Sequence, residues 1–102
     1  MSQWIRVAPL DEINDEDVTR FDHAEKTFAI YRMGNQLYAS DGLCTHEQAH
    51  LAEGFLFDYE IECPKHNGRF DIRDGRATRI PACVNVRIYR TKVVDGNIYI
   101  EI

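Results

Sequence analysis

Two short stretches decide the fold of this chain: C-T-H-E-Q-A-H at residues 44–50 and C-P-K-H at residues 63–66. Each places a cysteine two or three residues before a histidine, in a chain with only 3 Cys and 4 His. Thiolates and imidazoles together suit few metal centres, namely tetrahedral zinc or an iron–sulfur centre with mixed ligands. The pattern therefore indicates one metal site formed by Cys44, His46, Cys63 and His66.

The residues between the two stretches show how they meet. A run at 55–62, F-L-F-D-Y-E-I-E, reads as a strand. The segments 42–54 and 63–71 fit neither the period of a strand nor that of a helix. We therefore expect two loops at the same end of a sheet, brought together by one hairpin-like excursion of the chain.

Alternating hydrophobicity predicts strands elsewhere. Every second residue is apolar in V-N-V-R-I at 84–88 and in I-Y-I-E-I at 98–102, so one face of each strand is expected to be buried. The run T-F-A-I-Y at 27–31 is largely apolar without alternation, which indicates a strand covered on both faces. Glycine-containing turns separate such stretches, and V-V-D-G-N-I-Y-I at 93–100 predicts a terminal hairpin.

Many short strands at close spacing predict an all-β fold, a small antiparallel β-barrel or sandwich. Only the acidic segment 10–18 can start a helical turn, and we expect a loop or a single turn there. The length of 102 residues, without internal repeat or linker, predicts one domain spanning 1–102.

Composition excludes several classes of function. The net charge of −5 argues against nucleic acid or an anionic membrane as a partner. No apolar run is long enough to span a bilayer or serve as a signal peptide, so a cytoplasmic location is the expectation. Residues 1–64 hold 4 basic and 13 acidic side chains, and 65–102 hold 8 basic and 4 acidic. One interpretation is a solvated surface on which the charges of the two halves interleave once the chain folds; the other is a polarised molecule that docks onto charged partners. We favour the first.

The order of ligands bears on the choice of metal. Structural zinc sites prefer C-x2-4-C and H-x3-5-H, in which each arm carries like ligands. Here each arm carries one Cys and one His. Mixed arms suit a two-iron cluster in which one iron takes the cysteines and the other the histidines, because each loop then contacts both irons. A zinc-bound structural module stays open as the alternative.

The motif C-T-H-(16)-C-P-K-H resembles the binding box of Rieske [2Fe–2S] proteins. The whole chain is similar to the small Rieske-type ferredoxins of bacterial ring-hydroxylating oxygenases, naphthalene-dioxygenase-like systems among them. The likeness runs from W-I-R-V-A through Q-L-Y-A-S-D-G-L-C-T-H, I-E-C-P-K-H-N-G-R-F-D-I-R-D-G and Ile80-Pro81-Ala82 to the final hairpin. It implies the Rieske fold, with cluster-binding loops at about 42–54 and 63–71 and a covering proline loop at about 79–83.

The resemblance also implies a cofactor and a function. One [2Fe–2S] cluster would be held by Cys44 and Cys63 on one iron and by His46 and His66 on the other. The chain would be a one-electron carrier, not an enzyme. It would pass electrons from an NAD(P)H-dependent flavoprotein ferredoxin reductase to a terminal Rieske non-haem iron oxygenase of aromatic hydrocarbon catabolism. A shuttle of this kind is expected to be a cytoplasmic monomer. A subunit of a larger oxidoreductase, such as a nitrite reductase, is the rival within this fold.

Departures from the wider Rieske pattern bear on the potential. High-potential respiratory members carry a disulfide between the loops, and Ala49 and Lys65 stand at its positions here. Those members also carry a serine and a tyrosine that hydrogen-bond to sulfur, and Gly68 and Phe70 stand there. Such hydrogen bonds stabilise the reduced cluster, so their absence predicts a potential near the bottom of the Rieske range, about −150 mV.

Several other residues are ambiguous on sequence alone. His50 is expected to pack or face solvent, since the ligand set is complete without it, and Cys83 to be a small apolar residue without a redox role. Gly68 would let the backbone approach the cluster sulfurs, unless it is an ordinary turn glycine. Lys65 and Arg69 flank His66 and are candidates for partner docking.

Overall fold

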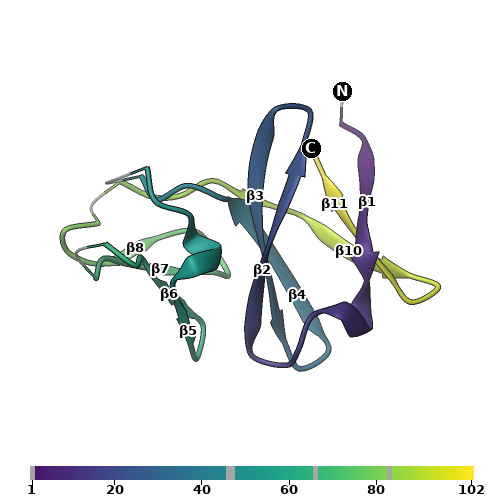
Figure 1. Ribbon diagram of the computed structural model, residues 1–102, viewed down its shortest axis with the longest axis horizontal. Helices are drawn as coiled ribbons and strands as arrows, with labels where there is room; N and C mark the ends of the chain where they lie inside the picture. The colour runs from purple at the N-terminus through teal and green to yellow at the C-terminus, as the bar shows by residue number, and fades with distance from the viewer. Residues whose placement is uncertain (1, 46–47, 66, 83) are drawn as a thin grey trace.

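The computed structural model describes residues 2–45, 48–65, 67–82 and 84–102. Their strands form three antiparallel sheets, with the orders β1–β11–β10, β2–β3–β4–β9 and β5–β6–β7–β8 (Figure 1). The all-β prediction is confirmed. The strands are β1 (Trp4–Pro9), β2 (Asp17–His23), β3 (Lys26–Met33), β4 (Gln36–Asp41), β5 (Phe55–Phe57), β6 (Glu60–Glu62), β7 (Arg69–Asp71), β8 (Ala77–Arg79), β9 (Ile88–Tyr89), β10 (Thr91–Val94) and β11 (Asn97–Glu101).

The sheet β2–β3–β4–β9 is the middle layer and contributes to two hydrophobic cores. One core, here called the basal core, joins it to the β1–β11–β10 sheet; the other, the loop core, joins it to the β5–β8 sheet and the flanking loops. Residues of β3 alternate between them, with Phe28 and Ile30 in the basal core and Ala29 and Tyr31 in the loop core. All four are at most 1% exposed. The prediction that 27–31 is covered on both faces is therefore confirmed.

The terminal hairpin is also as predicted. β10 and β11 pair antiparallel, and the turn residues Asp95 and Gly96 both have positive φ, 52° and 76°. Two left-handed residues in succession match the right-handed twist of a two-residue hairpin. Ile98 and Ile100 are fully buried in the basal core and Ile102 packs against it, as the alternation at 98–102 indicates.

The single strand expected at 55–62 is wrong. The run folds into two short strands, β5 and β6, that pair across a turn with Phe57 opposite Glu60. Asp58 has φ 55°, and an aspartate tolerates this left-handed conformation better than most residues, which lets the chain reverse. The hairpin that brings the two cysteine loops together is therefore β5–β6 itself.

The strand expected at 84–88 is also wrong. Of its three alternate apolar residues only Val86 is buried; Val84 is 60% and Ile88 39% exposed. The backbone groups of this segment form hydrogen bonds with a turn and a side chain instead of a neighbouring strand. The Val86 amide donates to the Gly75 carbonyl (2.9 Å), and the Val84 carbonyl accepts from the Thr45 hydroxyl (2.5 Å). Only Ile88–Tyr89 joins a ladder, as β9.

The remaining local elements are short. The acidic segment 10–18 forms one 3-10 turn, η1 (Leu10–Glu12), before β2 begins at Asp17, and η2 (Leu51–Glu53) precedes β5. Across the described parts of the chain, no helix has the length and hydrophobicity needed to cross a membrane.

Candidate metal centre

Cys44 and Cys63 begin two loops of equivalent construction. The Cys44 amide donates to the Ala49 carbonyl (2.9 Å), and the Cys63 amide donates to the Gly68 carbonyl (2.7 Å). In each case the backbone closes from a cysteine onto the fifth residue after it. The first loop is thus 44–49 and the second 63–68. By sequence, each encloses one histidine of the predicted ligand set, and those residues, His46 and His66, lie outside the described residues.

Both cysteines are buried in the same place. Cys44 is 4% and Cys63 1% exposed, and both belong to the loop core, together with Phe70 and Ala82. A thiolate in apolar surroundings is unfavourable without a counter-charge, and a metal ion supplies one. The cysteine burial and the type of donors therefore fit a metal centre at the junction of the two loops. Within the described ranges, no group of three or more His, Cys, Asp or Glu is placed to hold a metal.

The first loop is anchored to the start of β3. The Gly42 amide donates to the Thr27 carbonyl (2.9 Å), and the Leu51 amide, beyond the loop, donates back to the Gly42 carbonyl (2.8 Å). A side chain at Gly42 would stand 2.9 Å from the Thr27 carbonyl carbon, so this approach requires glycine. Leu43 and His50 form an isolated bridge across the loop's base. The loop therefore leaves the middle sheet in a fixed direction.

The second loop is the connection between β6 and β7. Glu62 and Arg69 face each other in the ladder at its base, with Arg69 Nε 2.9 Å from Glu62 Oε1. Arg69 also lies 3.6 Å from Glu60. Its guanidinium is therefore engaged within the sheet, which weakens the expectation that Arg69 contacts a partner. Lys65, at the tip, is exposed and has no hydrogen bond or ion pair among the described residues.

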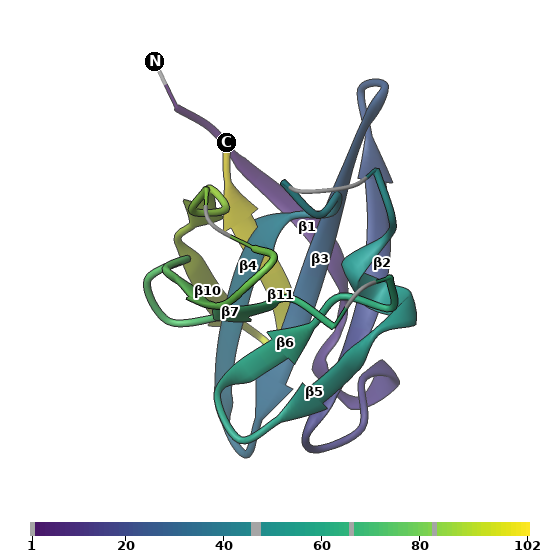
Figure 2. The same ribbon diagram turned by 90° about the vertical axis from the view of Figure 1, so that its left-hand side faces the viewer.

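A third segment, residues 79–86, joins both loops. The Thr45 hydroxyl donates to the Val84 carbonyl, and a Cβ on Gly68 would lie 2.9 Å from both Cβ and N of Ala82. Gly68 is therefore needed for the close approach of this covering segment, which is a more specific role than the one predicted. In Figure 2 the two loops and this segment gather on the face turned toward the viewer. Cys83 lies outside the described residues.

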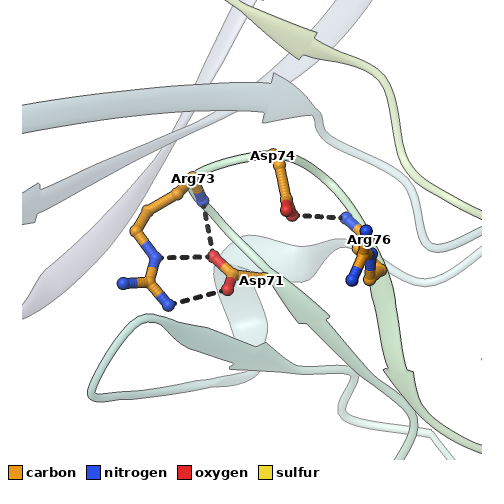
Figure 3. Close-up of polar contacts among 4 residues, drawn as sticks. All are labelled: Asp71, Arg73, Asp74 and Arg76. Atoms are coloured by element: carbon orange, nitrogen blue, oxygen red, sulfur yellow. Dashed lines mark hydrogen bonds and ion pairs between the residues drawn. The ribbon is translucent and has the colours of Figure 1, made fainter.

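A polar turn at 71–76 fixes the far end of the small sheet (Figure 3). Asp71 accepts hydrogen bonds from Arg73 Nε (3.0 Å), Nη2 (2.8 Å) and the Arg73 amide (2.9 Å), while Asp74 accepts from the Arg76 amide (2.9 Å). The Arg73 guanidinium beside it lowers the pKa of Asp71 below its usual value, although burial opposes the shift.

The same arginine reaches toward the middle sheet. The Arg73 guanidinium lies 4.4 Å from the ring centroid of Tyr59, and Tyr59 makes an edge contact with Tyr38 of β4 at 6.1 Å. Sequence reasoning identified only a turn signal at Asp74-Gly75 in this stretch. It missed this clasp, since nothing local in the sequence pairs Arg73 with a tyrosine 14 residues earlier.

His50 lies beside the first loop, not in it. It is half-buried and lines a cavity of about 560 Å³ with Thr27, Asp22 and Lys26. Its Nδ1 is buried and finds no hydrogen-bond partner among the described residues. The position agrees with the expectation of a packing histidine.

The comparisons with known proteins agree with this geometry. A family model described as "Rieske [2Fe-2S] domain" matches residues 3–90. The ferredoxin component of a naphthalene 1,2-dioxygenase system from Pseudomonas aeruginosa is 39% identical over 98% of this chain and 96% of its own length.

Solved structures give the same result. The ferredoxin of carbazole 1,9a-dioxygenase from Nocardioides aromaticivorans IC177 superposes with a TM-score of 0.92 at 37% identity, covering 96% of each chain. A chain from a solved structure of the complex of reduced oxygenase and oxidised ferredoxin in carbazole 1,9a-dioxygenase superposes with a TM-score of 0.91 at 32% identity, covering 95% of this chain and 91% of that one.

Proposed function

This chain belongs to the family of Rieske [2Fe–2S] proteins, and from that premise we propose which residues hold its cluster and where its electrons go. Like its ferredoxin relatives, it is an electron-transfer component and not itself an enzyme. We assign Cys44 and Cys63 to one iron, and His46 and His66 to the other. The single observation that supports the assignment best is the pair of equivalent loops, each starting at a buried cysteine and closed by its own backbone.

The protein's own residues do three things for such a centre. The loop core keeps water from the two cysteines, the closed loops fix the directions from which they approach, and the covering segment holds the loops together. When bound, a Rieske [2Fe–2S] cluster supplies reversible one-electron redox chemistry. Phe70 is fully buried and Gly68 has no side chain, so neither position offers a hydroxyl donor to sulfur. This favours a potential near the bottom of the Rieske range, about −150 mV.

The partners follow from the relatives. Ferredoxin components of dioxygenase systems stand between a reductase and a terminal oxygenase, and the structure of a similar chain in a complex with an oxygenase has been solved. We propose that this chain takes single electrons from an NAD(P)H-dependent flavoprotein reductase and delivers them to a terminal oxygenase acting on an aromatic compound. A monomer in the cytoplasm, where NAD(P)H is available, suits that role.

The experiment compares four single variants of the purified protein. Cys44→Ser and Cys63→Ser should lose iron, acid-labile sulfide and visible absorption, whereas Cys83→Ser and His50→Gln should keep them. After reduction with dithionite, the low-temperature EPR spectrum of the wild-type protein should show the low average g value of a cluster with two nitrogen ligands. A colourless wild-type protein that binds zinc would overturn the assignment, and retention of the cluster by Cys44→Ser or Cys63→Ser would remove that cysteine from it.

A further inference from the structure

The large apolar side chains with the highest exposure belong to the small sheet and the loops around it. Ile80 is 81% and Val84 60% exposed, on either side of the buried Ala82 in the covering segment. Phe55 (71%) and Phe57 (66%) lie on β5, at the edge of the small sheet. Exposed apolar pairs of this kind are unfavourable in water unless something covers them part of the time.

Ile80 and Val84 lie next to the two cysteine loops. The Val84 carbonyl is bound by Thr45, the residue after Cys44, and Ala82 packs against Gly68, the last residue of the second loop. Any protein that approaches the loops closely enough to exchange an electron would therefore meet these two side chains. The β5 pair is joined to the loops through the β5–β6 ladder, in which Phe55 stands opposite Glu62, the residue before Cys63. Ile80 and Val84 differ in that they flank the residue that packs on Gly68.

The second loop and the covering segment carry an excess of positive charge. Residues 63–86 contain five Arg or Lys and two Asp, in a chain with a net charge of −5. Arg69 and Arg73 are neutralised by close carboxylates. Lys65 is exposed without a partner among the described residues, and Arg79, half-exposed, has only a distant contact of 3.9 Å with Glu62. Arg79 precedes Ile80 and stands opposite Arg69 at the base of the second loop.

Acidic side chains outnumber basic ones in the rest of the chain, including residues 44–62, which hold five Asp or Glu and no Arg or Lys. Residues 11–17 hold five Asp or Glu and no Arg or Lys, and this segment connects β1 to β2, away from the small sheet (Figure 1). Charges of the two halves of the chain do meet in the small sheet, where Arg69 and Arg79 lie near Glu62. A partner that approaches the second loop would meet the positive charges of Lys65 and Arg79 although the protein as a whole is negative.

We propose that Ile80, Val84, Lys65 and Arg79 form the surface that docks onto the terminal oxygenase, and that the oxygenase presents an apolar patch bordered by carboxylates. The proposal rests on the proposed function, because it takes the loops as the site of electron exit. Two apolar residues and two cations make a small interface, which suits a brief redox encounter. The cations steer the encounter and the apolar pair prolongs it.

The test measures electron transfer from the reduced protein to the purified terminal oxygenase of the naphthalene 1,2-dioxygenase system, whose own ferredoxin is 39% identical to this chain. Ile80→Ser/Val84→Ser should lower the second-order rate about tenfold at all salt concentrations, because truncated apolar anchors weaken the complex. Lys65→Gln/Arg79→Gln should lower it several-fold at low salt only, because salt already screens these charges in the wild type.

The β1–β11–β10 sheet, which lies on the other side of the middle sheet, offers residues for control variants. Val93 (41%) and Val94 (43%) are exposed apolar residues of β10, and Arg90 is an exposed cation. Val93→Ser/Val94→Ser and Arg90→Gln should transfer electrons at the wild-type rate. Equal rates for all variants would overturn the proposal. A defect confined to electron uptake from the reductase would also overturn it, because the surface would then bind the reductase. A wild-type protein that dithionite reduces but that fails to reduce the oxygenase would overturn it as well.

A small oxidant tests the charge without any protein partner. Ferricyanide takes one electron from the reduced protein and is strongly anionic. Its rate should fall as salt rises, and this slope should flatten in Lys65→Gln/Arg79→Gln but not in Arg90→Gln. A rate that rises with salt, as the net charge of −5 alone would give, refutes the positive surface. A protein with no reducible cluster would instead refute the proposed function, so the two failures are distinguishable.

Discussion

A single methyl group at Gly68 should separate the covering segment from the second loop. The added Cβ would lie 2.9 Å from the Cβ and 2.9 Å from the amide nitrogen of Ala82. Ordinary contacts between carbon atoms are about 3.5–4.0 Å, so one of the two backbones must move by roughly 0.6–1.1 Å. Neither atom belongs to a flexible side chain that could rotate away. The Gly68→Ala variant therefore strains the contact between the loop and its cover.

The magnitude follows from what the movement disrupts. Overpacking a close contact costs about 1–3 kcal/mol. The Ala82 amide also donates to the Arg79 carbonyl at 3.1 Å, which is already long, and a shift of this size would break that bond at a further cost of about 1 kcal/mol. We expect Gly68→Ala to lower the free energy of unfolding by about 2–4 kcal/mol and to raise the rate at which a chelator removes iron about tenfold or more.

Two measurements check this expectation, urea unfolding followed by circular dichroism and loss of visible absorption in excess chelator. The double variant Gly68→Ala/Ala82→Gly removes the contact between the two Cβ atoms but leaves the contact with the Ala82 nitrogen, so it should recover part of the loss. Wild-type stability and wild-type iron release in Gly68→Ala would refute the reasoning, because they would mean that the covering segment does not need this approach.

Two further predictions concern residues of the turn at 71–76, and Gly96 of the terminal hairpin serves as the comparison for Gly75. Gly75 and Gly96 have similar positive φ, 81° and 76°, but a Cβ at Gly75 would meet the Val86 carbonyl oxygen whereas Gly96 has open space around it. Gly96→Ala should therefore lose about 1–2 kcal/mol of stability from backbone strain alone, and Gly75→Ala markedly more in the same unfolding assay. Asp71→Asn should cost about 0.5–1 kcal/mol at pH 7, because the pair with Arg73 is partly exposed. Because the fold lowers the pKa of Asp71, the carboxylate's contribution to stability is present above the unfolded pKa near 3.8 and is lost as pH falls through the folded pKa. Wild type and Asp71→Asn should therefore converge in stability below about pH 4. A stability difference that does not change with pH would contradict this.

Local patterns in the sequence were sufficient where the partners of a residue are close in the chain. The pairing of cysteine and histidine within each loop is a matter of two or three residues, and the resemblance of the whole ligand box pointed to the family that the comparisons show. The terminal hairpin was predictable for the same reason, because an Asp-Gly turn and alternating isoleucines specify it without help from the rest of the chain.

Prediction failed where distant segments decide. The alternation at 84–88 is typical of a strand, yet Val84 stands exposed because its carbonyl is bound by Thr45, 39 residues earlier, and the segment covers the loops instead of joining a ladder. The clasp of Arg73 on Tyr59 had no sequence signal for a similar reason. The uneven distribution of charge along the chain could be read from the sequence. Only the structure, in which Arg69 is paired closely with Glu62, showed which cations remain available to contact a partner.

The two cores explain why the cysteines lie where they do. The loop core has the middle sheet as one wall, and β3 gives that wall its rigidity because its alternate residues are locked into the basal core on the other side. The opposite wall is a sheet of four three-residue strands, which is marginal by itself. What gives this wall a fixed shape is a set of specific cross-links: the two backbone-closed loops, the Thr45–Val84 and Gly68–Ala82 contacts, and the clasp of Arg73 on Tyr59. A metal centre ligated by both loops would complete that set, since it would tie Cys44 on the rigid side to Cys63 on the marginal side. The same segment that closes the site also presents Ile80 and Val84 to solvent, so the stability of the centre and the surface offered to a partner depend on one stretch of chain.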